Sequence, residues 1–148
     1  MLRNLRMTDI ENLILIENSV HIIPWNKQAF NICLQTEGNL GWVKETDKEN
    51  LIGFIIIRLK AECHVLNLSI AKTYQRQGLG GQLLTHALQY AKQKGVHIAY
   101  LEVRRSNLPA INLYKKMAFT LIGERKNYYP IANHHEDALI FAKNIAHF

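Results

Sequence analysis

The most informative motif of the chain is the glycine-rich stretch Tyr74-Gln75-Arg76-Gln77-Gly78-Leu79-Gly80-Gly81. It follows a strand-like run that ends at Ile70, and it opens a helical pattern that continues to about Lys94. Glycine lets a backbone approach a ligand closely, and the first N–H groups of a helix lack partners within that helix. We therefore expect an anion site for phosphate or pyrophosphate at this turn, with a ligand-free tight turn as the alternative.

Two common phosphate-binding motifs do not fit this turn. A P-loop needs a lysine and a serine or threonine directly after its last glycine, and neither residue follows Gly81. A dinucleotide-binding motif needs the spacing G-x-G-x-x-G and an acidic residue about 20 residues further on. The spacing Gln75-x-x-Gly78-x-Gly80 differs from that motif, so a different phosphate-carrying cofactor is expected.

Strand and helix patterns on both sides of the turn predict a mixed α/β fold. Strand patterns occupy Leu2 to Arg6, Gly41 to Glu45, Leu51 to Arg58, Glu62 to Ile70, Ile98 to Val103, Phe119 to Ile122, Tyr129 to Ile131 and Ala138 to Ala142. Helical patterns begin after Thr8 or Asp9, after Asn26, after Gly78 and after Asn107. No repeat or linker interrupts the chain, so we expect one domain over residues 1–148, with parallel strands around the third helix.

The first helix has a clear division between apolar and charged positions. Its apolar positions are Ile10, Leu13, Ile14 and Ile16. We expect Glu11 and Glu17 to lie on the other side of this helix, away from the apolar positions.

Composition restricts the class of protein and its partners. The 148 residues are 48% hydrophobic with a formal net charge of +6, and no apolar run approaches the roughly 20 residues that a membrane-spanning helix needs. The basic residues are spread along the chain without a lysine- and arginine-rich block, so no direct nucleic-acid binding is expected. The N-terminus lacks a signal-peptide pattern, and Cys33 and Cys63 lie far apart without a metal-ligand spacing. We expect a cytoplasmic protein without a metal ion, a membrane contact or a disulfide.

The turn resembles Q/R-x-x-G-x-G/A, the acyl-CoA-binding signature of the GCN5-related N-acetyltransferases (GNAT). Further motifs resemble the RimI group of that family, the bacterial ribosomal-protein-alanine N-acetyltransferases, and they are Pro24-Trp25, Leu101-Glu102-Val103-Arg104, Asn107-x-x-Ala110-x-x-x-Tyr114, Arg125-x-Asn127-Tyr128-Tyr129 and Glu136-Asp137-Ala138. The resemblance runs over nearly the whole chain. It implies a mixed central sheet of about six or seven strands with about four helices, in which a splayed pair of parallel strands forms the acetyl-CoA slot.

The resemblance also assigns residues to the cofactor. Backbone N–H groups of the turn would hold the pyrophosphate, and they belong to Arg76, Gln77, Gly78, Leu79, Gly80 and Gly81. The pantetheine arm would pair like a strand with the backbone of Leu68, Ser69 and Ile70, and an N–H there could polarise the thioester oxygen. Asn107 resembles a family contact to this arm, and its alternative role is that of a helix N-cap only.

Acetyl transfer to an amine needs a base and an acid, and two residues match the family pattern. Glu102 is the expected general base, acting directly or through water, because an ammonium has no lone pair for attack. Tyr114 is the expected general acid, which protonates the leaving CoA thiolate. The alternatives are a solvated strand residue for Glu102 and a core aromatic for Tyr114.

The acceptor implied by the resemblance is the N-terminal alanine of small ribosomal subunit protein eighteen, acetylated by direct transfer in a ternary complex. An α-amino group has a pKa near ~8 and lysine near ~10.4, so lysine costs about 3 kcal/mol more to deprotonate near neutral pH. Five residues are expected to line the peptide cleft: Trp25, Tyr128, Tyr129, Glu136 and Asp137. The two acids would attract a basic peptide, with a solvated turn as their alternative.

Other hypotheses remain open at this stage. The same fold could act on a lysine or a small molecule, or the chain could be a non-catalytic CoA- or RNA-associated module. We expect a monomer, with a substrate met either free or on the ribosome. One residue departs from the family pattern: Ala118 stands where relatives usually have glycine before Phe119, and alanine disfavours the left-handed conformation of a helix C-terminus.

Overall fold

The computed structural model describes residues 1–131 and 134–148. The strands are β1 (Leu2–Asn4), β2 (Asn39–Glu45), β3 (Leu51–Leu59), β4 (Cys63–Ile70), β5 (Ile98–Arg104), β6 (Thr120–Ile131) and β7 (His134–Asn144). The α-helices are α1 (Ile10–Val20), α2 (Lys27–Gln35), α3 (Leu79–Gln93) and α4 (Leu108–Lys116), with short 3-10 helices at Met7–Asp9 and Lys72–Tyr74. None of the described helices combines the length and the apolar character needed to cross a membrane.

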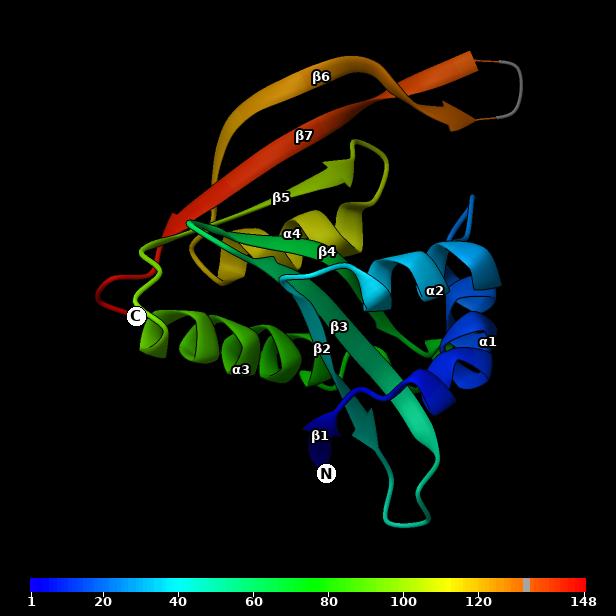
Figure 1. The fold of residues 1–148 in the computed structure, drawn as a ribbon. Helices are drawn as coiled ribbons and strands as arrows, with labels where there is room; N and C mark the ends of the chain where they lie inside the picture. The colour runs from blue at the N-terminus through cyan, green and yellow to red at the C-terminus, as the bar shows by residue number, and fades with distance from the viewer. Residues whose placement is uncertain (132–133) are drawn as a thin grey trace.

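One sheet of seven strands organises the described residues, in the order β1-β2-β3-β4-β5-β7-β6 (Figure 1). Only β4 and β5 are parallel among the paired strands of this part of the chain, and α3 connects them. The mixed sheet with four flanking α-helices confirms the predicted fold, including the parallel pair around the glycine-rich turn.

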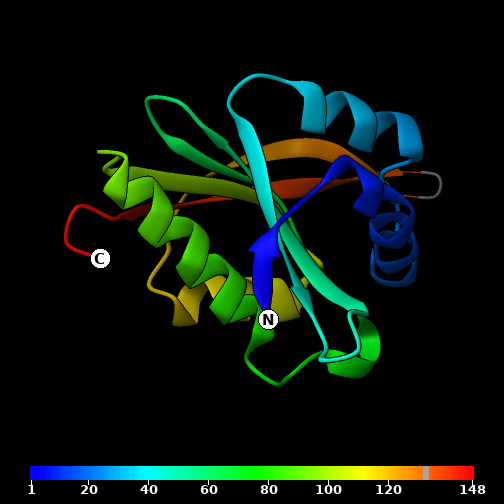
Figure 2. The ribbon, with the colours of Figure 1, turned by 60° about the horizontal axis from the view of Figure 1, so that its bottom comes forward.

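Helices cover both faces of the sheet, and each face has its own apolar cluster. One cluster packs α3 and α4 against side chains such as Ile55 and Ile57, while the other packs α1 and α2 against Phe54 and Ile56. Figure 2 shows α3 on one side of the sheet and the two N-terminal helices on the other. The central strand β3 is therefore buried on both faces, as its continuous apolar run predicts.

The C-terminal hairpin corrects one expectation. Phe119 to Ile122 and Tyr129 to Ile131 were predicted as strand segments separated by a polar segment, but β6 runs unbroken from Thr120 to Ile131. Its pairing with β7 has two register shifts, and Asn127 has a φ of 54° at the second. A bulge leaves its extra residues unpaired while the ladder resumes beyond it, so this polar segment interrupts the pairing locally without ending the strand.

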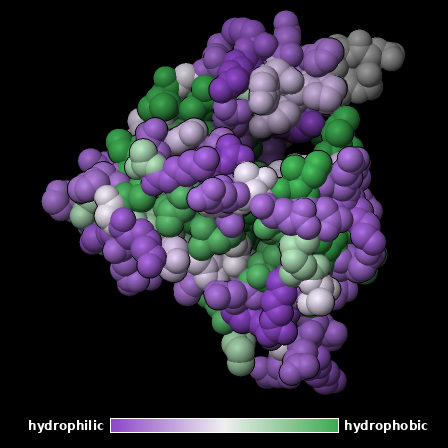
Figure 3. Space-filling view, in the orientation of Figure 1, coloured by the Kyte–Doolittle hydropathy of each residue, from purple (hydrophilic) through white to green (hydrophobic). Residues whose placement is uncertain are grey.

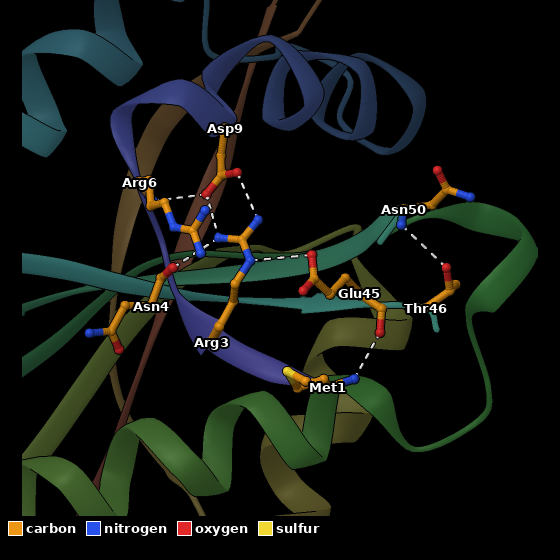
Figure 4. Close-up of polar contacts among 8 residues, drawn as sticks. All are labelled: Met1, Arg3, Asn4, Arg6, Asp9, Glu45, Thr46 and Asn50. Carbon is orange, nitrogen blue, oxygen red and sulfur yellow. Dashed lines mark hydrogen bonds and ion pairs between the residues drawn. The ribbon is translucent and has the colours of Figure 1, made fainter. Parts of the chain in front are cut away.

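The N-terminal strand is fastened by one arginine (Figure 4). Two nitrogens of Arg3 each donate to a different oxygen of Asp9 at 2.9 Å, and the third lies 3.2 Å from Glu45. Asp9 also accepts from the backbone N–H of Arg6 at 2.8 Å. A guanidinium can donate two parallel hydrogen bonds to one carboxylate. Here it links β1 to the start of α1 and to the end of β2.

Candidate active site

The parallel strands β4 and β5 separate after a short contact. They pair only at Cys63–Ala99, His64–Tyr100 and Val65–Leu101. Leu66 is an extra residue on β4, because Ile57 pairs with Val65 while Ile56 pairs with Asn67. Such a bulge bends a strand, and Figure 1 shows β4 and β5 diverging beyond it. The predicted splayed pair is confirmed, and it leaves the edge of β4 from Leu66 to Ile70 facing the opening.

A cavity of about 150 Å³ lies where the two strands part. Its lining residues come from α1 and the following loop, β4, β5, α4 and β6, and they are Glu17, His21, Ile23, Trp25, Val65, Leu66, Asn67, Leu68, Leu101, Glu102, Val103, Arg104, Asn107, Ala110, Tyr114 and Tyr129. In Figure 3 the surface is hollowed beneath the β6–β7 hairpin. The fold thus brings the predicted base, the predicted acid and two predicted peptide contacts to one site.

Glu102 is held in the cavity wall by an ion pair. Its side chain is 14% exposed, and Nε of Arg125 lies 3.0 Å from its Oε1. Burial raises the pKa of the neighbouring Tyr129 to about 12, and the negative charge of Glu102 acts in the same direction. Glu102 is therefore a partly buried carboxylate beside a phenol and a guanidinium, unlike a solvated edge residue.

Tyr114 presents a protonated phenol to the same cavity. It is 7% exposed, and its ring packs against Phe119 and Phe141 with centroids 5.9 and 6.5 Å away. Burial raises the pKa of Tyr114 well above its usual value, with Tyr129 adding to the effect. The phenol stays a proton donor throughout the neutral range, while its aromatic neighbours also make it part of the core.

The turn after α4 fixes the backbone of Tyr114 in spite of Ala118. The carbonyl of Tyr114 accepts from the N–H of Phe119 at 2.9 Å, and that of Lys115 accepts from Ala118 at 3.0 Å. These two bonds form a Schellman motif, which needs a left-handed residue, and Ala118 has a φ of 66°. Alanine therefore keeps the turn that glycine would make, at a conformational cost.

The glycine-rich turn has the geometry that an anion site needs. Gly78 precedes α3 with a φ of 81°, and a Cβ built on it would meet no other heavy atom within 4 Å. Gln75 anchors the turn to β4, because its Nε2 donates to the carbonyl of Ile70 at 2.9 Å. Space therefore remains beside the first N–H groups of α3, and the binding of a pyrophosphate there stays a prediction.

Asn107 does serve as a helix cap. Its Oδ1 accepts from the N–H of Ala110 at 3.3 Å, and Asn107 also lines the cavity. Its Oδ1 can accept a second hydrogen bond and its Nδ2 can still donate. The capping role is therefore compatible with the predicted contact to the pantetheine arm, which stays a prediction.

The predicted peptide-binding residues divide into two groups. Trp25 and Tyr129 line the cavity, whereas Tyr128 is 48% exposed and lies outside the lining. Tyr128 packs edge-on against Tyr129 at 5.1 Å between ring centroids, and the guanidinium of Arg125 lies 5.1 Å from its centroid. The structure thus places Tyr128 next to Tyr129 but outside the cavity lining.

The two predicted acids already have partners within the chain. Glu136 lies 3.3 Å from Arg104 and accepts from the hydroxyl of Ser106 at 3.0 Å. Asp137 accepts from the N–H of Asn127 at 2.9 Å, and this bond lowers its pKa. Both acids hold the hairpin and the β5–α4 loop in place, so attraction of a basic peptide by them competes with these bonds and stays a prediction.

Sequence reasoning missed a group of polar residues on the α1 side of the cavity. Glu17 was expected on the side of α1 away from its apolar positions, but it is 2% exposed and accepts from Asn67 Nδ2 at 2.9 Å. Its spacing from Ile10 and Leu13 is that of a core-facing stripe, and that spacing is the signal that could have found it. The group is completed by the half-buried His21 and the buried Ser69, whose Nε2 and Oγ atoms lie 2.7 Å apart.

Comparison with known proteins decides the family. The family model described as "Acetyltransferase (GNAT) family" matches residues 6–119, which is more than half of the chain. The chain belongs to the GNAT acetyltransferase family. Among the residues described, no three His, Cys, Asp or Glu side chains are grouped to hold a metal ion.

Relatives within the GNAT family are similar over nearly their full length. The [ribosomal protein bS18]-alanine N-acetyltransferase of Salmonella typhimurium is 36% identical over 143 residues, covering 96% of this chain and 95% of the relative. The enzyme of the same name from Escherichia coli K12 is 35% identical over 144 residues, covering 97% and 96%.

Solved structures of GNAT proteins match the fold. The Escherichia coli ribosomal-protein-S18-alanine N-acetyltransferase superposes with a TM-score of 0.91 at 34% identity, covering 100% of this chain and 95% of the other. Arabidopsis thaliana NAA60 in complex with acetyl-CoA has a TM-score of 0.86 at 23% identity, covering 98% of each chain, and it supports the fold alone.

Proposed function

We propose that this protein transfers the acetyl group of acetyl-CoA to the α-amine of an N-terminal alanine on a ribosomal protein, the counterpart of bS18. The observation that carries the proposal is the meeting of Glu102 and Tyr114 in one cavity at the point where β4 and β5 part. A module that only binds CoA or RNA needs neither a base nor an acid there. The names of the relatives that are about 35% identical support this choice of acceptor.

The open edge of β4 and the turn before α3 would hold the cofactor. Residues Arg76 to Gly81 offer backbone N–H groups to the pyrophosphate, next to the space left at Gly78. Leu68, Ser69 and Ile70 lie beyond the last pair between β4 and β5, so their backbone can bind an extended, amide-rich arm. When bound, acetyl-CoA supplies an activated acetyl thioester, and a backbone N–H near Leu68 would polarise its oxygen.

Glu102 and Tyr114 would move the two protons of the reaction. Glu102 takes a proton from the substrate ammonium, directly or through water, which frees the nitrogen lone pair. The amine nitrogen then bonds to the acetyl carbon as the carbon–sulfur bond breaks. Tyr114 gives its proton to the departing sulfur, and the nitrogen passes its second proton to the Tyr114 phenolate, directly or through water. Glu102 then releases the proton it took to the solvent, so one proton leaves overall for each acetyl group transferred.

An α-amine suits this set of residues better than a lysine. The lysine ammonium would cost about 3 kcal/mol more to deprotonate near neutral pH, and Glu102, the expected base, is already paired with Arg125. Trp25 and Tyr129 would pack against the first residues of the acceptor. We further propose that the protein acts as a monomer in the cytoplasm, on a substrate met free or on the ribosome.

Intact-mass analysis of peptides tests the proposal. A peptide that begins with alanine and carries one internal lysine is incubated with acetyl-CoA and the protein, next to the same peptide with a blocked N-terminus. We expect one added acetyl group on the first peptide and none on the blocked one. Acetylation of the blocked peptide would show a lysine acceptor, and no product on either peptide would contradict an acetyltransferase of peptide amines.

A further inference from the structure

Four polar side chains on the α1 side of the cavity have no part in the proton transfers described above. We call Glu17, His21, Asn67 and Ser69 the α1–β4 network. Glu17, Asn67 and Ser69 are buried, and Glu17, His21 and Asn67 line the cavity. Burying a carboxylate is costly unless its oxygens are hydrogen-bonded, so the buried Glu17 depends on the hydrogen bonds that it accepts.

The directions of the hydrogen bonds in the α1–β4 network can be assigned. Asn67 Nδ2 donates to Glu17 Oε1 at 2.9 Å, and the N–H of Trp25 donates to Glu17 Oε2 at 3.0 Å. Ser69 donates its hydroxyl hydrogen to Asn67 Oδ1 at 2.8 Å. A hydroxyl has one hydrogen, so Ser69 Oγ must accept in its 2.7 Å contact with His21 Nε2. The proton therefore lies on Nε2 of His21.

The second nitrogen of His21 is then an acceptor. Burial lowers the pKa of His21; the Arg104 cation acts in the same direction, and Glu17, 3.6 Å from Nε2, acts against it. The ring is neutral near pH 7, and a neutral imidazole has one N–H and one lone pair. With Nε2 protonated, the lone pair is on Nδ1, on a residue that lines the cavity.

We propose that the α1–β4 network fixes His21 as the Nε2–H tautomer, and that His21 Nδ1 then accepts a hydrogen bond from the N-terminal ammonium of the acceptor. This inference rests on the proposed function. His21 is the residue that touches the substrate, and Glu17 is a positioning residue that acts through Asn67 and Ser69. The ammonium thereby meets a neutral acceptor from the α1 side and a carboxylate, Glu102, from β5.

A single isosteric change should reverse the whole network. In Glu17→Gln, the oxygen of the new amide still accepts from the N–H of Trp25, and its NH₂ faces Asn67. The Asn67 amide must then turn over, accept with Oδ1 and donate with Nδ2 to Ser69. Ser69 in turn donates to His21 Nε2, so the proton moves to Nδ1. The variant keeps size and hydrogen-bond number while it presents a donor to the ammonium.

Histidine side-chain ¹⁵N NMR measures the tautomer without reference to activity. We expect the wild-type protein to carry the proton on Nε2 of His21, and Glu17→Gln to carry it on Nδ1. His21→Gln assigns the signals, and His64, which is stacked on Tyr100 outside the network, is an internal control that should not change. Adding a peptide that begins with alanine should shift the Nδ1 signal of the wild-type protein.

Steady-state kinetics give the second readout. In Glu17→Gln and in His21→Gln, KM for the acceptor peptide should rise about tenfold or more, as for a lost hydrogen bond to a charged group. KM for acetyl-CoA and kcat should change by less than about threefold, because uniform binding of the acceptor is what is lost. A general loss of folding would instead change all three values and the melting temperature.

The outcomes separate this inference from the proposed function. A proton on Nδ1 in the wild-type protein, or no reversal in Glu17→Gln, overturns the tautomer assignment. Reversal without a rise in the KM for the peptide, or no peptide-induced shift at Nδ1, overturns the contact to the ammonium. A wild-type protein that binds the peptide at His21 but yields no acetylated product contradicts the proposed reaction and leaves the binding role standing.

Discussion

Arg125 Nε lies 3.0 Å from Glu102 Oε1, although the two residues belong to strands that are not neighbours in the sheet. Strand β7 lies between them, and the arginine reaches across it from β6 to β5. The guanidinium holds the carboxylate in one orientation at the cavity wall. Because the Arg125 side chain is half exposed, it can turn away without disturbing the core when a cationic acceptor approaches.

Replacing Glu102 by glutamine tests its part as the base. Glu102→Gln keeps the size of the side chain and removes its ability to take a proton, so kcat/KM for the peptide should fall by about 10²–10⁴. The dissociation constant of acetyl-CoA, measured by calorimetry, should stay the same. Glu124→Gln, which alters an ion pair between β6 and Arg105 just after β5, is the matched control and should retain activity. Equal activity of the two variants would remove Glu102 from the mechanism.

Tyr114→Phe tests whether Tyr114 acts as the general acid or only forms a wall of the cofactor site. The variant should lose kcat by about 10²-fold or more, because the leaving sulfur no longer receives a proton. Acetyl-CoA should bind as before, since the ring packing against Phe119 and Phe141 is retained. Since burial raises the pKa of Tyr114, its ionisation should cause no loss of wild-type rate up to about pH 10. Tyr90→Phe, on the α3 side next to Trp42, is the control.

Ala118→Gly should stabilise the protein. A left-handed φ of 66° costs alanine about 1 kcal/mol, and glycine adopts it without that cost. The melting temperature should rise by about 2–4 °C in calorimetry. Ala29→Gly places the same exchange inside α2, where it should lower the stability by about 1 kcal/mol. A fall in melting temperature for Ala118→Gly would contradict the strain assigned to this turn.

The Arg3–Asp9 pair should make stability depend on pH. Burial tends to raise the pKa of Asp9, but the hydrogen bonds from Arg3 and the N–H of Arg6 outweigh it and lower the pKa. The pKa is lower in the folded state than in the unfolded state, so the contribution is fully present above about pH 4 and is lost as the pH falls further.

Urea unfolding at two pH values measures this contribution. At pH 7, Asp9→Asn should lower the free energy of unfolding by about 1.5–3 kcal/mol, as for hydrogen bonds to a charged group. The difference from wild type should shrink at pH 3. Asp47→Asn, at an exposed position in the β2–β3 turn, should change the free energy of unfolding by less than about 0.5 kcal/mol at both pH values. A difference that stays the same at pH 3 would show that the charge of Asp9 is not the cause.

Local patterns were sufficient to predict most of the fold. The alternating run of β4, the apolar stripe of α3 and the caps at Asn26 and Asn107 are each encoded within a few neighbouring residues. Prediction was wrong for β6, where the pairing with β7 resumes at Tyr129 after a bulge, because a bulge interrupts a ladder without ending the strand. It was also wrong for Glu17, where a buried partner on a distant strand outweighs the usual preference of a glutamate for water.

Local sequence patterns predict the site less completely than the fold. The family motif locates Glu102 and Tyr114, and the cavity that joins them depends on how β5 and α4 pack. The Arg125–Glu102 pair and the bonds of Glu136 and Asp137 arise from strands brought together by the hairpin. Contacts of this kind depend on register and bulges, which the order of residues along one strand does not specify.

Leu66 sets the phase of β4 as well as its bend. Cys63 and Val65 face the cluster under α3, and after the extra residue it is Leu68 and Ile70 that do so. The odd-numbered Asn67 and Ser69 thereby switch faces and meet Glu17 and His21 on the side of α1. If β4 instead alternated regularly through Leu66, Asn67 and Ser69 would point into the apolar cluster under α3. One bulge therefore both separates β4 from β5 and places the polar side chains of Asn67 and Ser69 on the α1 side.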